Sequence, residues 1–264
     1  MKLGFIGCGN MAGAMIGGIL KKQILNKEDI LASAKTEGTL QRVKEKYGIV
    51  TTLDNCQVAK EAQILVLAVK PIYYEEVIAQ IRDQVDDNTI VISIAPGKTL
   101  DWLDKRFGKE VKLVRCMPNT PALVGEGMTG VCCNKEVTDE EMTYVQSLLE
   151  SFGKAQVVPE HLMDVVVSVS GSSPAYVFMF IEAMADAAVA DGMPRAQAYE
   201  FAAQSVLGSA KMVLETGMHP GVLKDMVCSP GGTTIEAVRV LEEKGMRSAV
   251  IEGMKACVKK AKGL

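Results

Sequence analysis

The sequence has 264 residues, more than one typical domain, which indicates a large domain followed by a smaller unit. Hydrophobic residues make up 48% of the chain and charged residues 23%, as in ordinary soluble globular proteins. The 29 Lys and Arg residues nearly balance the 32 Asp and Glu residues, leaving a net charge of -3. This balance gives no indication of a nucleic-acid partner.

The cysteines and histidines limit the kind of chemistry that the chain supports. The seven cysteines are scattered without a Cys-x-x-Cys pair, which favours reduced thiols and a cytoplasmic location. His161 and His219 are the two histidines, so a histidine-rich metal site is excluded and we expect chemistry without a metal. Residues 3–20 are uncharged, but their glycines disfavour an apolar helix, so we expect neither export nor a membrane partner.

The first 160 residues alternate short β-type runs with amphipathic helical stretches, which is typical of parallel βαβ units. The expected strands cover residues 2–6, 30–33, 63–69, 89–94, 111–116, 128–132 and 155–158. The expected helices cover residues 11–22, 39–47, 73–84, 100–107 and 139–151. Several strands lack alternation between apolar and polar residues, as expected where both faces are covered. We therefore predict an α/β fold with an N-terminal, Rossmann-type, doubly wound parallel sheet.

After Pro159 the sequence contains helical patterns and no further strand pattern. We predict a dinucleotide-binding domain over residues 1–160 and an all-helical domain over residues 161–264 for substrate binding and dimerisation. Ser173 and Pro174 indicate the N-cap and first position of a long helix. Gly192 would end that helix, and a second long helix would follow and end at Gly217.

The helix expected over residues 174–191 carries apolar side chains around most of its circumference. They include Tyr176, Val177, Phe178, Met179, Phe180, Ile181, Met184 and Val189. Because a small domain cannot bury so much of one helix, we expect a second subunit to cover part of it. A central core helix in a monomer is the alternative.

A glycine-rich turn follows the first strand and opens a helix. It reads Gly7-Cys8-Gly9-Asn10-Met11-Ala12, the G-x-G-x-x-A form of the dinucleotide-binding fingerprint. Gly7 permits a tight turn, Gly9 allows a pyrophosphate to approach the backbone, and Ala12 allows close helix packing. The start of the helix supplies free N–H groups. A glycine turn with a structural role is the alternative interpretation.

The end of the second expected strand bears on which dinucleotide binds. An Asp or Glu at this position would hydrogen-bond the free ribose 2′-hydroxyl of NAD. Residues 32–36 read Ala-Ser-Ala-Lys-Thr instead, and these hydroxyls and the Lys35 cation suit a 2′-phosphate. We expect NADP(H), with NAD(H) as the alternative and with Lys35 as a plain surface lysine in that case.

The positions of the tyrosines and lysines indicate which kind of reduction the chain can catalyse. None of the six tyrosines has a lysine four residues further on, and no lysine lies between Lys154 and Lys211, where β-hydroxyacid dehydrogenases place theirs. The usual acids of alcohol-forming reductases are therefore missing. A cyclic imine can already carry the proton that makes its carbon electrophilic, so imine reduction fits better.

Residues 229–234, Ser-Pro-Gly-Gly-Thr-Thr, precede another expected helix and leave backbone N–H groups accessible at its positive end. Such a turn can hold a carboxylate. The alternative is a plain helix start, because residues Thr233 to Glu236 read as a capping box.

Several stretches closely resemble the pyrroline-5-carboxylate reductase family, in the same order along nearly the whole chain. They are residues 4–11 (GFIGCGNM), 68–71 (AVKP), 115–121 (RCMPNTP), 171–176 (GSSPAY) and 223–235 (LKDMVCSPGGTTI). The resemblance implies reduction of L-1-pyrroline-5-carboxylate to L-proline with NAD(P)H, the last step of proline biosynthesis. It also implies a homodimer joined through the helical domain, with a ring of such dimers as a further expectation.

The resemblance, together with the patterns above, assigns candidate site residues. The expected cofactor-binding residues are Ile6, Gly7, Cys8, Gly9, Asn10, Met11, Ser33, Lys35, Asn55, Ala68, Val69, Lys70, Pro71, Ala95, Pro96 and Gly97. The expected substrate-binding residues are Gly231, Gly232, Thr233, Thr234 and Ile235. Thr234 and Ser229 are the expected catalytic residues, with Thr234 contacting the ring nitrogen and Ser229 the carboxylate.

Two points stay open at this stage. Pro96 stands where many relatives have a small residue, which leaves the shape of its loop open. The alternative functions are a related NADP-dependent reductase of another cyclic imino acid and a non-catalytic nucleotide-sensing protein on the same fold.

Overall fold

The structure, a computed structural model, describes residues 2–263 and divides them into two compact units. The first unit runs through to Ser172 and includes the chain from Cys257 onward, and the second unit is Ser173–Ala256. Met163 packs with Met117 and Cys132 of the sheet, which keeps the first turns after Pro159 within the first unit. The domain boundary near residue 160 concerns the functional division of the chain and stays a prediction.

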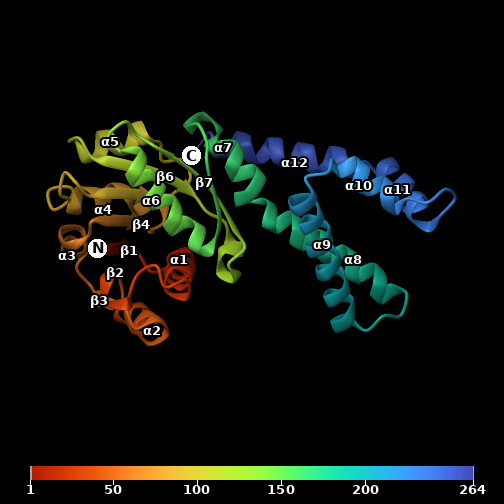
Figure 1. Ribbon diagram of the computed structural model, residues 1–264, viewed down its shortest axis with the longest axis horizontal. Coiled ribbons are helices and arrows are strands. Elements are labelled where there is room, and N and C mark those ends of the chain that lie inside the picture. Colours follow the sequence, from red (N-terminus) through yellow and green to blue (C-terminus); the bar gives the residue numbers. More distant parts are fainter. Residues whose placement is uncertain (1, 264) are drawn as a thin grey trace. The chain divides into compact units, whose positions relative to one another are not determined.

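An eight-stranded sheet forms the centre of the first unit, in the order β3-β2-β1-β4-β5-β6-β7-β8 (Figure 1). The strands are β1 (Leu3–Ile6), β2 (Ile30–Ser33), β3 (Val50–Thr52), β4 (Ile64–Leu67), β5 (Ile90–Ser93), β6 (Lys112–Met117), β7 (Gly127–Cys133) and β8 (Gly153–Val157). Strands β1 to β6 are parallel, whereas β7 runs antiparallel to β6 and parallel to β8. The predicted Rossmann-type sheet is confirmed.

The register of the sheet aligns the carboxyl ends of its central strands. Ile6 of β1 pairs with Ser33 of β2 on one side and with Leu67 of β4 on the other. Leu67 in turn pairs with Ser93, the last residue of β5. The segments that follow these four strands therefore leave the sheet at one edge, where open α/β sheets bind ligands.

Helices cover both faces of this sheet. They are α1 (Asn10–Lys21), α2 (Glu37–Tyr47), α3 (Asn55–Glu61), α4 (Tyr74–Ile81), α5 (Leu100–Phe107), α6 (Asp139–Leu149) and α7 (Met163–Val166). Phe5 points into a core with helices α1 and α6, and its neighbour Ile6 points into the opposite core with α3, α4 and α5. Because both faces are buried, the strands can be apolar throughout, as the sequence indicated.

The sequence patterns missed two neighbouring elements, strand β3 and helix α3. Strand β3 has three residues and lies at the edge of the sheet with Val50 exposed, so it has little apolar pattern to detect. Helix α3 begins after Asp54, whose carboxylate accepts a hydrogen bond from the N–H of Cys56 at 2.8 Å. This capping aspartate was the available signal.

Short 3₁₀ segments join several of these elements. They are η1 (Lys27–Asp29), η2 (Pro71–Tyr73), η3 (Thr120–Val124), η4 (Glu150–Phe152) and η5 (Glu160–Leu162). Two of them, η2 and η3, follow the carboxyl ends of β4 and β6 and contain the proline that ends each extended segment. Pro71 and Pro121 therefore direct the chain at the ligand-binding edge.

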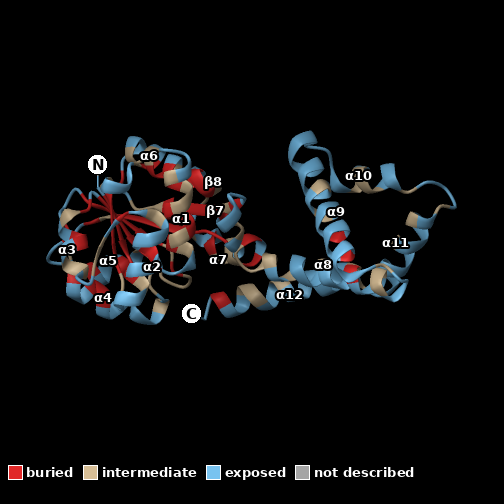
Figure 2. Cartoon of the chain, turned by 90° about the horizontal axis from the view of Figure 1, so that it is seen from below, coloured by how far each residue is buried: buried red, intermediate tan, exposed pale blue. Residues whose placement is uncertain are grey.

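The second unit consists of helices with few buried side chains, as the pale ribbons of Figure 2 show. Its elements are α8 (Ser173–Ala190), α9 (Arg195–Thr216), α10 (Pro220–Val227), α11 (Thr233–Glu243) and the larger part of α12 (Met246–Ala261). Helices α8 and α9 pack against each other, and α9 ends at Gly217 as predicted. The predicted all-helical C-terminal domain is confirmed.

The predicted start of helix α8 was wrong in its detail. Ser173 is the first residue of α8, and a π-helical segment, η6 (Val167–Gly171), comes just before it. In this segment the N–H of Ser172 donates to the carbonyl of Val167 at 2.7 Å, so the chain is already helical where an extended N-cap was expected. Single π-helical turns within helices often mark functional sites.

The run of helix Glu160–Ala190 is long and apolar enough to cross a membrane by length and composition. Its apolar side chains are exposed along α8, where Phe178 is 60% and Met179 68% exposed. Within α8, Ala185 is buried. An apolar surface of this kind is suited to burial against another protein surface or in a membrane.

Candidate cofactor and substrate sites

The glycine turn after β1 has the geometry that a bound pyrophosphate requires. Gly7 has φ +99°, and a Cβ there would lie 2.7 Å from the carbonyl oxygen of Ala68, so a side chain is excluded. Gly9 precedes α1 as its N-cap, and beyond its neighbours in the chain no atom of the described residues lies within 4 Å of the position that its Cβ would occupy. The first N–H groups of α1 lack helical partners and are available for an anion.

Two residues at this turn, Ile6 and Cys8, have buried side chains. Ile6 is buried in the core between the sheet and helices α3, α4 and α5, and its carbonyl accepts a hydrogen bond from the N–H of Ala68 at 2.8 Å. Cys8 is also buried, and its thiol lies 3.4 Å from the carbonyl oxygen of Ser33. Burial raises the pKa of the Cys8 thiol to about 11, so this group is neutral at physiological pH. The thiol therefore has a structural role.

The end of β2 differs from the expectation that its hydroxyls face a 2′-phosphate. Ser33 is fully buried, and its hydroxyl donates to Oδ1 of Asn55 at 2.7 Å. Asn55 in turn donates through Nδ2 to Oε1 of Gln80 at 2.9 Å. The Thr36 hydroxyl accepts from the N–H of Thr39 and caps α2. Ser33 thus orients Asn55, and both hydroxyls are already engaged.

Lys35 is exposed, as a side chain that binds a phosphate group must be. Its ammonium lies 5.5 Å from the centre of the Tyr73 ring, which belongs to η2 after the β4 loop. Such a cation–π contact limits the positions that a flexible lysine samples. Tyr73 was not among the predicted site residues, because a pairing between two exposed loops leaves no pattern in the sequence.

The other predicted cofactor residues lie in two loops at the same edge of the sheet. Ala68–Pro71 follows β4, and Ala95–Gly97 follows β5. Ala95 is buried, whereas Pro96 and Gly97 are half-buried and Gly97 has φ +74°. The structure thus brings together the turn after β1, Ser33, Asn55 and these two loops, as the sequence indicated.

Asn119, in the turn after β6, was missed as an individual residue. It is buried, and its Nδ2 donates to the carbonyl of Ser170 at 2.9 Å while its Oδ1 accepts from Met128 N at 2.8 Å. Both polar atoms of the side chain therefore join the turn to strand β7 and to the π-helical segment. An Asn between two prolines was the signal in the sequence.

The loop before α11 contains the predicted substrate residues. Gly231 has φ +68°, and the N–H of Gly232 donates to the carbonyl of Ser229 at 3.0 Å, which closes a tight turn. A Cβ on Gly232 would collide with the hydroxyl oxygen of Ser229. Gly231 therefore permits the turn, and Gly232 leaves room for the Ser229 hydroxyl beside the start of the helix.

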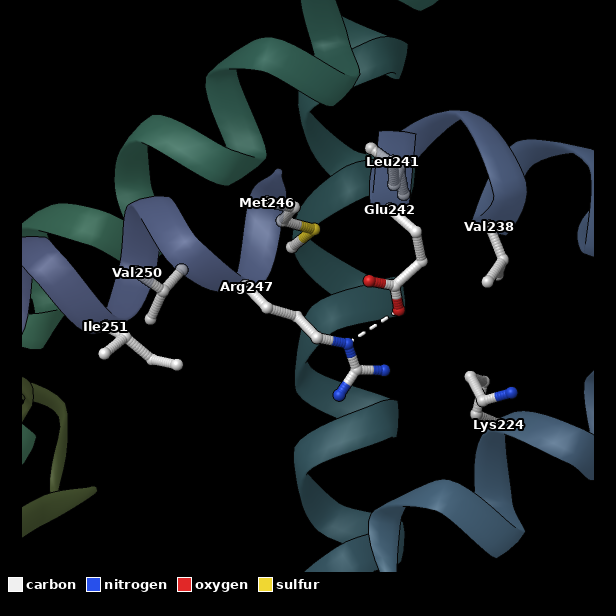
Figure 3. A pocket seen from close by; sticks show the side chains of 8 residues that line it. All are labelled: Lys224, Val238, Leu241, Glu242, Met246, Arg247, Val250 and Ile251. Atoms are coloured by element: carbon white, nitrogen blue, oxygen red, sulfur yellow. Dashed lines mark hydrogen bonds and ion pairs between the residues drawn. The ribbon is translucent and has the colours of Figure 1, made fainter. Parts of the chain in front are cut away.

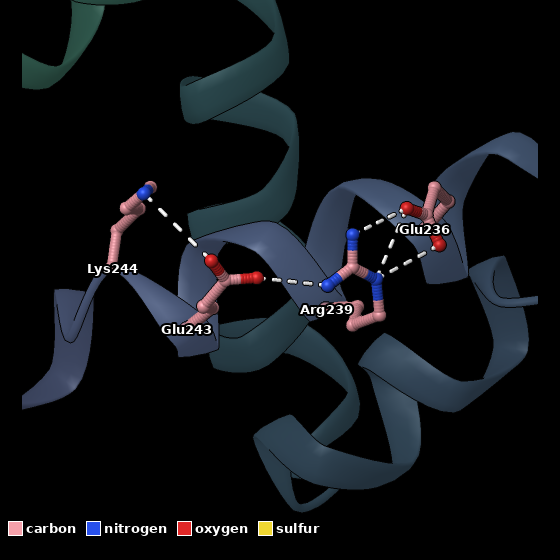
Figure 4. A network of polar contacts seen from close by, with 4 residues as sticks. All are labelled: Glu236, Arg239, Glu243 and Lys244. Atoms are coloured by element: carbon pink, nitrogen blue, oxygen red, sulfur yellow. Dashed lines mark hydrogen bonds and ion pairs between the residues drawn. The ribbon is translucent and has the colours of Figure 1, made fainter.

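The alternative interpretation of this loop, a capping box at Thr233, was wrong. Gly232 is the N-cap of α11, which places Thr233 and Thr234 at the first two helical positions. The Glu236 carboxylate pairs with Arg239 at 2.7 Å instead of reaching back to the N-cap, and Arg239 also binds Glu243 (Figure 4). The N–H groups of Thr233, Thr234 and Ile235 thus remain available to an anion.

A pocket of 480 Å³ lies on the helical unit between α10, α11 and α12 (Figure 3). Its lining side chains are Lys224, Val238, Leu241, Glu242, Met246, Arg247, Val250 and Ile251. The Arg247 guanidinium forms an ion pair with Glu242 at 2.6 Å. The apolar side chains therefore make up most of the pocket lining that a ligand or partner could contact. This pocket is part of the exposed apolar surface of the unit.

No group of three or more His, Cys, Asp and Glu side chains within residues 2–263 is arranged to hold a metal ion. The cysteines of this part of the chain are all free thiols. The polar groups gathered at the sheet edge include backbone amides and the side chains of Ser33, Lys35 and Asn55.

The fold and the glycine turn define a two-domain, dinucleotide-binding oxidoreductase. Residues 2–97 match the family model described as NADP oxidoreductase, coenzyme F420-dependent. Residues 160–264 match the model described as pyrroline-5-carboxylate reductase dimerisation.

Full-length relatives identify the family. The chain is 53% identical to pyrroline-5-carboxylate reductase of Escherichia coli (strain K12), a match that covers 100% of this chain and 98% of that protein. It superposes on the solved pyrroline-5-carboxylate reductase of Coxiella burnetii with a TM-score of 0.92 and 36% identity, over 99% and 97% of the two chains. The Plasmodium falciparum pyrroline carboxylate reductase, solved with NADP bound, gives a TM-score of 0.90 at 33% identity over 100% and 97%. The chain belongs to the pyrroline-5-carboxylate reductase family.

Proposed function

We propose that the chain reduces L-1-pyrroline-5-carboxylate to L-proline with NADPH, the last step of proline biosynthesis. The main support is 53% identity over the full chain to a pyrroline-5-carboxylate reductase. The cofactor turn and the Ser229–Thr234 loop are both present with geometry suited to anions. These features count against a non-catalytic nucleotide sensor.

The cofactor fits the residues at the sheet edge. Gly7 permits the tight turn against Ala68, and the missing side chain at Gly9 leaves space for a pyrophosphate at the first N–H groups of α1. We assign the 2′-phosphate to Lys35, since the second strand ends without an Asp or Glu and Lys35 is exposed at that point. Asn55, oriented by Ser33, would contact the ribose nearby. When bound, the reduced nicotinamide supplies the hydride that the imine carbon accepts.

The substrate requires a carboxylate site and a contact for the ring nitrogen. The N–H group of Thr233 and the hydroxyl of Ser229 would hold the carboxylate, favoured by the positive end of α11. The N–H of Gly232, which the sequence also suggested for this role, is already bound to the carbonyl of Ser229. Thr234 lies on the first helical turn, so its hydroxyl would hydrogen-bond the ring nitrogen. No acid has to donate a proton during the reaction, because the iminium form already carries it.

We further propose a homodimer formed through the helical unit, in the cytoplasm and without a membrane partner. The exposed apolar side chains of α8 supply a surface that a second subunit would cover, and this helix lies in the segment matched by the dimerisation family. The free cysteines suit a reducing compartment. A ring of such dimers is the larger assembly that we propose.

The decisive experiment follows NADPH oxidation by the full-length protein with L-1-pyrroline-5-carboxylate and then with the six-membered cyclic analogue. We expect turnover to be much faster with the five-membered ring. Faster turnover with the six-membered ring would assign the chain to the alternative imino-acid reductase. Tight NADPH binding without turnover of either imine would favour the nucleotide sensor.

A further inference from the structure

A buried tyrosine hydroxyl links the two strand ends from which the predicted cofactor loops, Ala68–Pro71 and Ala95–Gly97, begin. Tyr74 is the first residue of α4, and its side chain is 0% exposed. Its hydroxyl donates to the carbonyl oxygen of Leu67 at 2.6 Å. It also accepts from the Ser93 hydroxyl at 3.2 Å and from the N–H of Ile94 at 3.3 Å. One oxygen atom thus takes part in three hydrogen bonds.

These partners belong to the ends of two neighbouring strands. Leu67 and Ser93 are the last residues of β4 and β5, and they pair with each other in the sheet register. The ladder of backbone hydrogen bonds ends there, so the buried carbonyl of Leu67 and the partly buried N–H of Ile94 need other partners. The Tyr74 hydroxyl supplies both, and the cofactor loops Ala68–Pro71 and Ala95–Gly97 begin immediately afterward.

Burial raises the pKa of the Tyr74 hydroxyl above its ordinary value, so the proton donated to Leu67 stays in place at physiological pH. Because the phenol ring is rigid and fully enclosed, the oxygen has little freedom to move. The distance between the two strand ends is therefore set by this one atom as well as by the sheet.

We propose that Tyr74 is a positioning residue for the cofactor, whose hydroxyl fixes the two loops after β4 and β5 relative to each other. The proposal rests on the proposed function, in that it takes these loops to contact NADPH. A tyrosine that only packs in the core would need its ring but not its hydroxyl, whereas a positioning role for Tyr74 requires the hydroxyl.

The chain offers a matched control at the opposite edge of the same two strands. Thr89 precedes β5, and its buried hydroxyl donates to the carbonyl of Ala62, which precedes β4, at 3.1 Å. Thr89→Val and Tyr74→Phe each remove one buried hydroxyl that links β4 to β5. They differ in whether the link lies at the cofactor edge or at the far edge.

The test measures NADPH binding and thermal unfolding of the full-length wild type, Tyr74→Phe and Thr89→Val. We expect both variants to unfold at lower temperature, because each leaves buried polar groups unpaired. Tyr74→Phe should raise the Kd for NADPH by roughly 5- to 10-fold, whereas Thr89→Val should change it by less than about twofold. The KM for the imine should stay near the wild-type value in both.

Two results would overturn the proposal. One is Tyr74→Phe binding NADPH as tightly as the wild type, and the other is Thr89→Val weakening NADPH as much as Tyr74→Phe. If Tyr74→Phe does not fold, Ser93→Ala replaces it, since it removes one donor to the hydroxyl and keeps the ring. Unchanged NADPH binding in Ser93→Ala would then count against the proposal. Failure of the wild type to bind NADPH would instead refute the proposed function.

Discussion

The guanidinium Nη1 of Arg115 lies 3.1 Å from Oε1 of Glu160, and the Arg115 side chain is 2% exposed. The same carboxylate oxygen accepts a hydrogen bond from the N–H of Leu100 at 2.7 Å, at the start of α5. Among the residues described, Nε and Nη2 of Arg115 have no hydrogen-bond partner, although Nη2 is 3.8 Å from an oxygen of Asp164. Arg115 is thus a buried cation that depends on Glu160.

This dependence predicts an asymmetry between two substitutions. Glu160→Ala should destabilise the fold by about 2–3 kcal/mol, somewhat below the usual range for a broken buried pair because Glu160 is 32% exposed. Arg115→Met should cost less, about 1 kcal/mol, because it removes the buried charge and leaves the bond from Leu100 to Glu160 intact. Urea unfolding of both variants measures the difference.

The exposed pair Lys105–Asp101 provides a control for this comparison, with side chains 71% and 74% exposed. Lys105→Met should change the free energy of unfolding by less than about 0.5 kcal/mol. A larger loss in Arg115→Met than in Glu160→Ala would mean that the carboxylate, not the guanidinium, is the poorly compensated group.

Lys35→Ala should weaken NADPH roughly 5- to 20-fold and leave NADH binding nearly unchanged, because the lost contact is to the 2′-phosphate alone. Calorimetric titration at fixed salt with each nucleotide measures both constants. Lys46→Ala is the matched control, since Lys46 is also exposed and its ammonium also lies over a tyrosine ring, that of Tyr47. Equal losses for NADPH and NADH in Lys35→Ala would place the 2′-phosphate elsewhere.

The sequence predicted the parts of the site that depend on local backbone geometry. The turn at Gly7 and Gly9 is such a part, since a glycine fingerprint between a strand and a helix leaves few alternatives. The burial of Ser33, the pairing of Lys35 with Tyr73 and the bonds of Tyr74 could not be predicted. They depend on the register of strands that are distant in sequence.

The start of α11 shows a different limit. Thr233 to Glu236 satisfies the sequence pattern of a capping box, but Gly232 takes the N-cap position and Arg239 binds the glutamate. Glu236 can pair with Arg239 three residues later or reach back to the backbone, and the pattern alone does not decide between them. The error matters because it changes what Thr233 is expected to do.

Buried thiols predict a loss of stability at high pH. Burial raises the pKa of Cys8 to about 11 and that of Cys132 to about 12, and it also raises the pKa of Cys116. In the unfolded chain these thiols ionise near pH 8.5, so above that pH the unfolded state binds fewer protons than the folded state. The stabilisation is complete below about pH 8.5 and is lost as the pH rises toward 11.

Urea unfolding under reducing conditions between pH 8 and 11 measures this loss, which should reach about 1.4 kcal/mol per pH unit for each buried thiol. Cys8→Ala should make the decline shallower. Cys56→Ala is the control, because Cys56 is only partly buried. An equal slope in wild type and Cys8→Ala would show that Cys8 ionises in the folded protein as readily as in the unfolded chain.

Phe178→Glu should dissociate the proposed dimer, because it places a charge on an apolar surface that a second subunit would cover. Sedimentation at nanomolar to micromolar concentration should show that the wild type has no folded monomer and that the variant is monomeric or unfolded. Leu53→Glu is the control, since Leu53 is 54% exposed in the nucleotide-binding unit, outside the matched dimerisation segment. A stable, active wild-type monomer would refute the proposed interface.

Thr234→Ala should lower kcat roughly 30- to 1,000-fold, because one oriented hydrogen bond in a desolvated site contributes on the order of 2–4 kcal/mol to transition-state stabilisation. Its NADPH affinity and free energy of unfolding should stay near the wild-type values, since Thr234 lies outside the cofactor turn at Gly7 and Gly9 and is not buried.

Thr233→Ala is the matched variant one residue earlier. Because Gly232 is the N-cap, Thr233 has no cap to lose, and Thr233→Ala should change stability by less than about 0.5 kcal/mol. Steady-state kinetics and urea unfolding of the two variants test these assignments together. Full activity in Thr234→Ala with loss of activity in Thr233→Ala would exchange their roles, and full activity in both would move the substrate away from the start of α11.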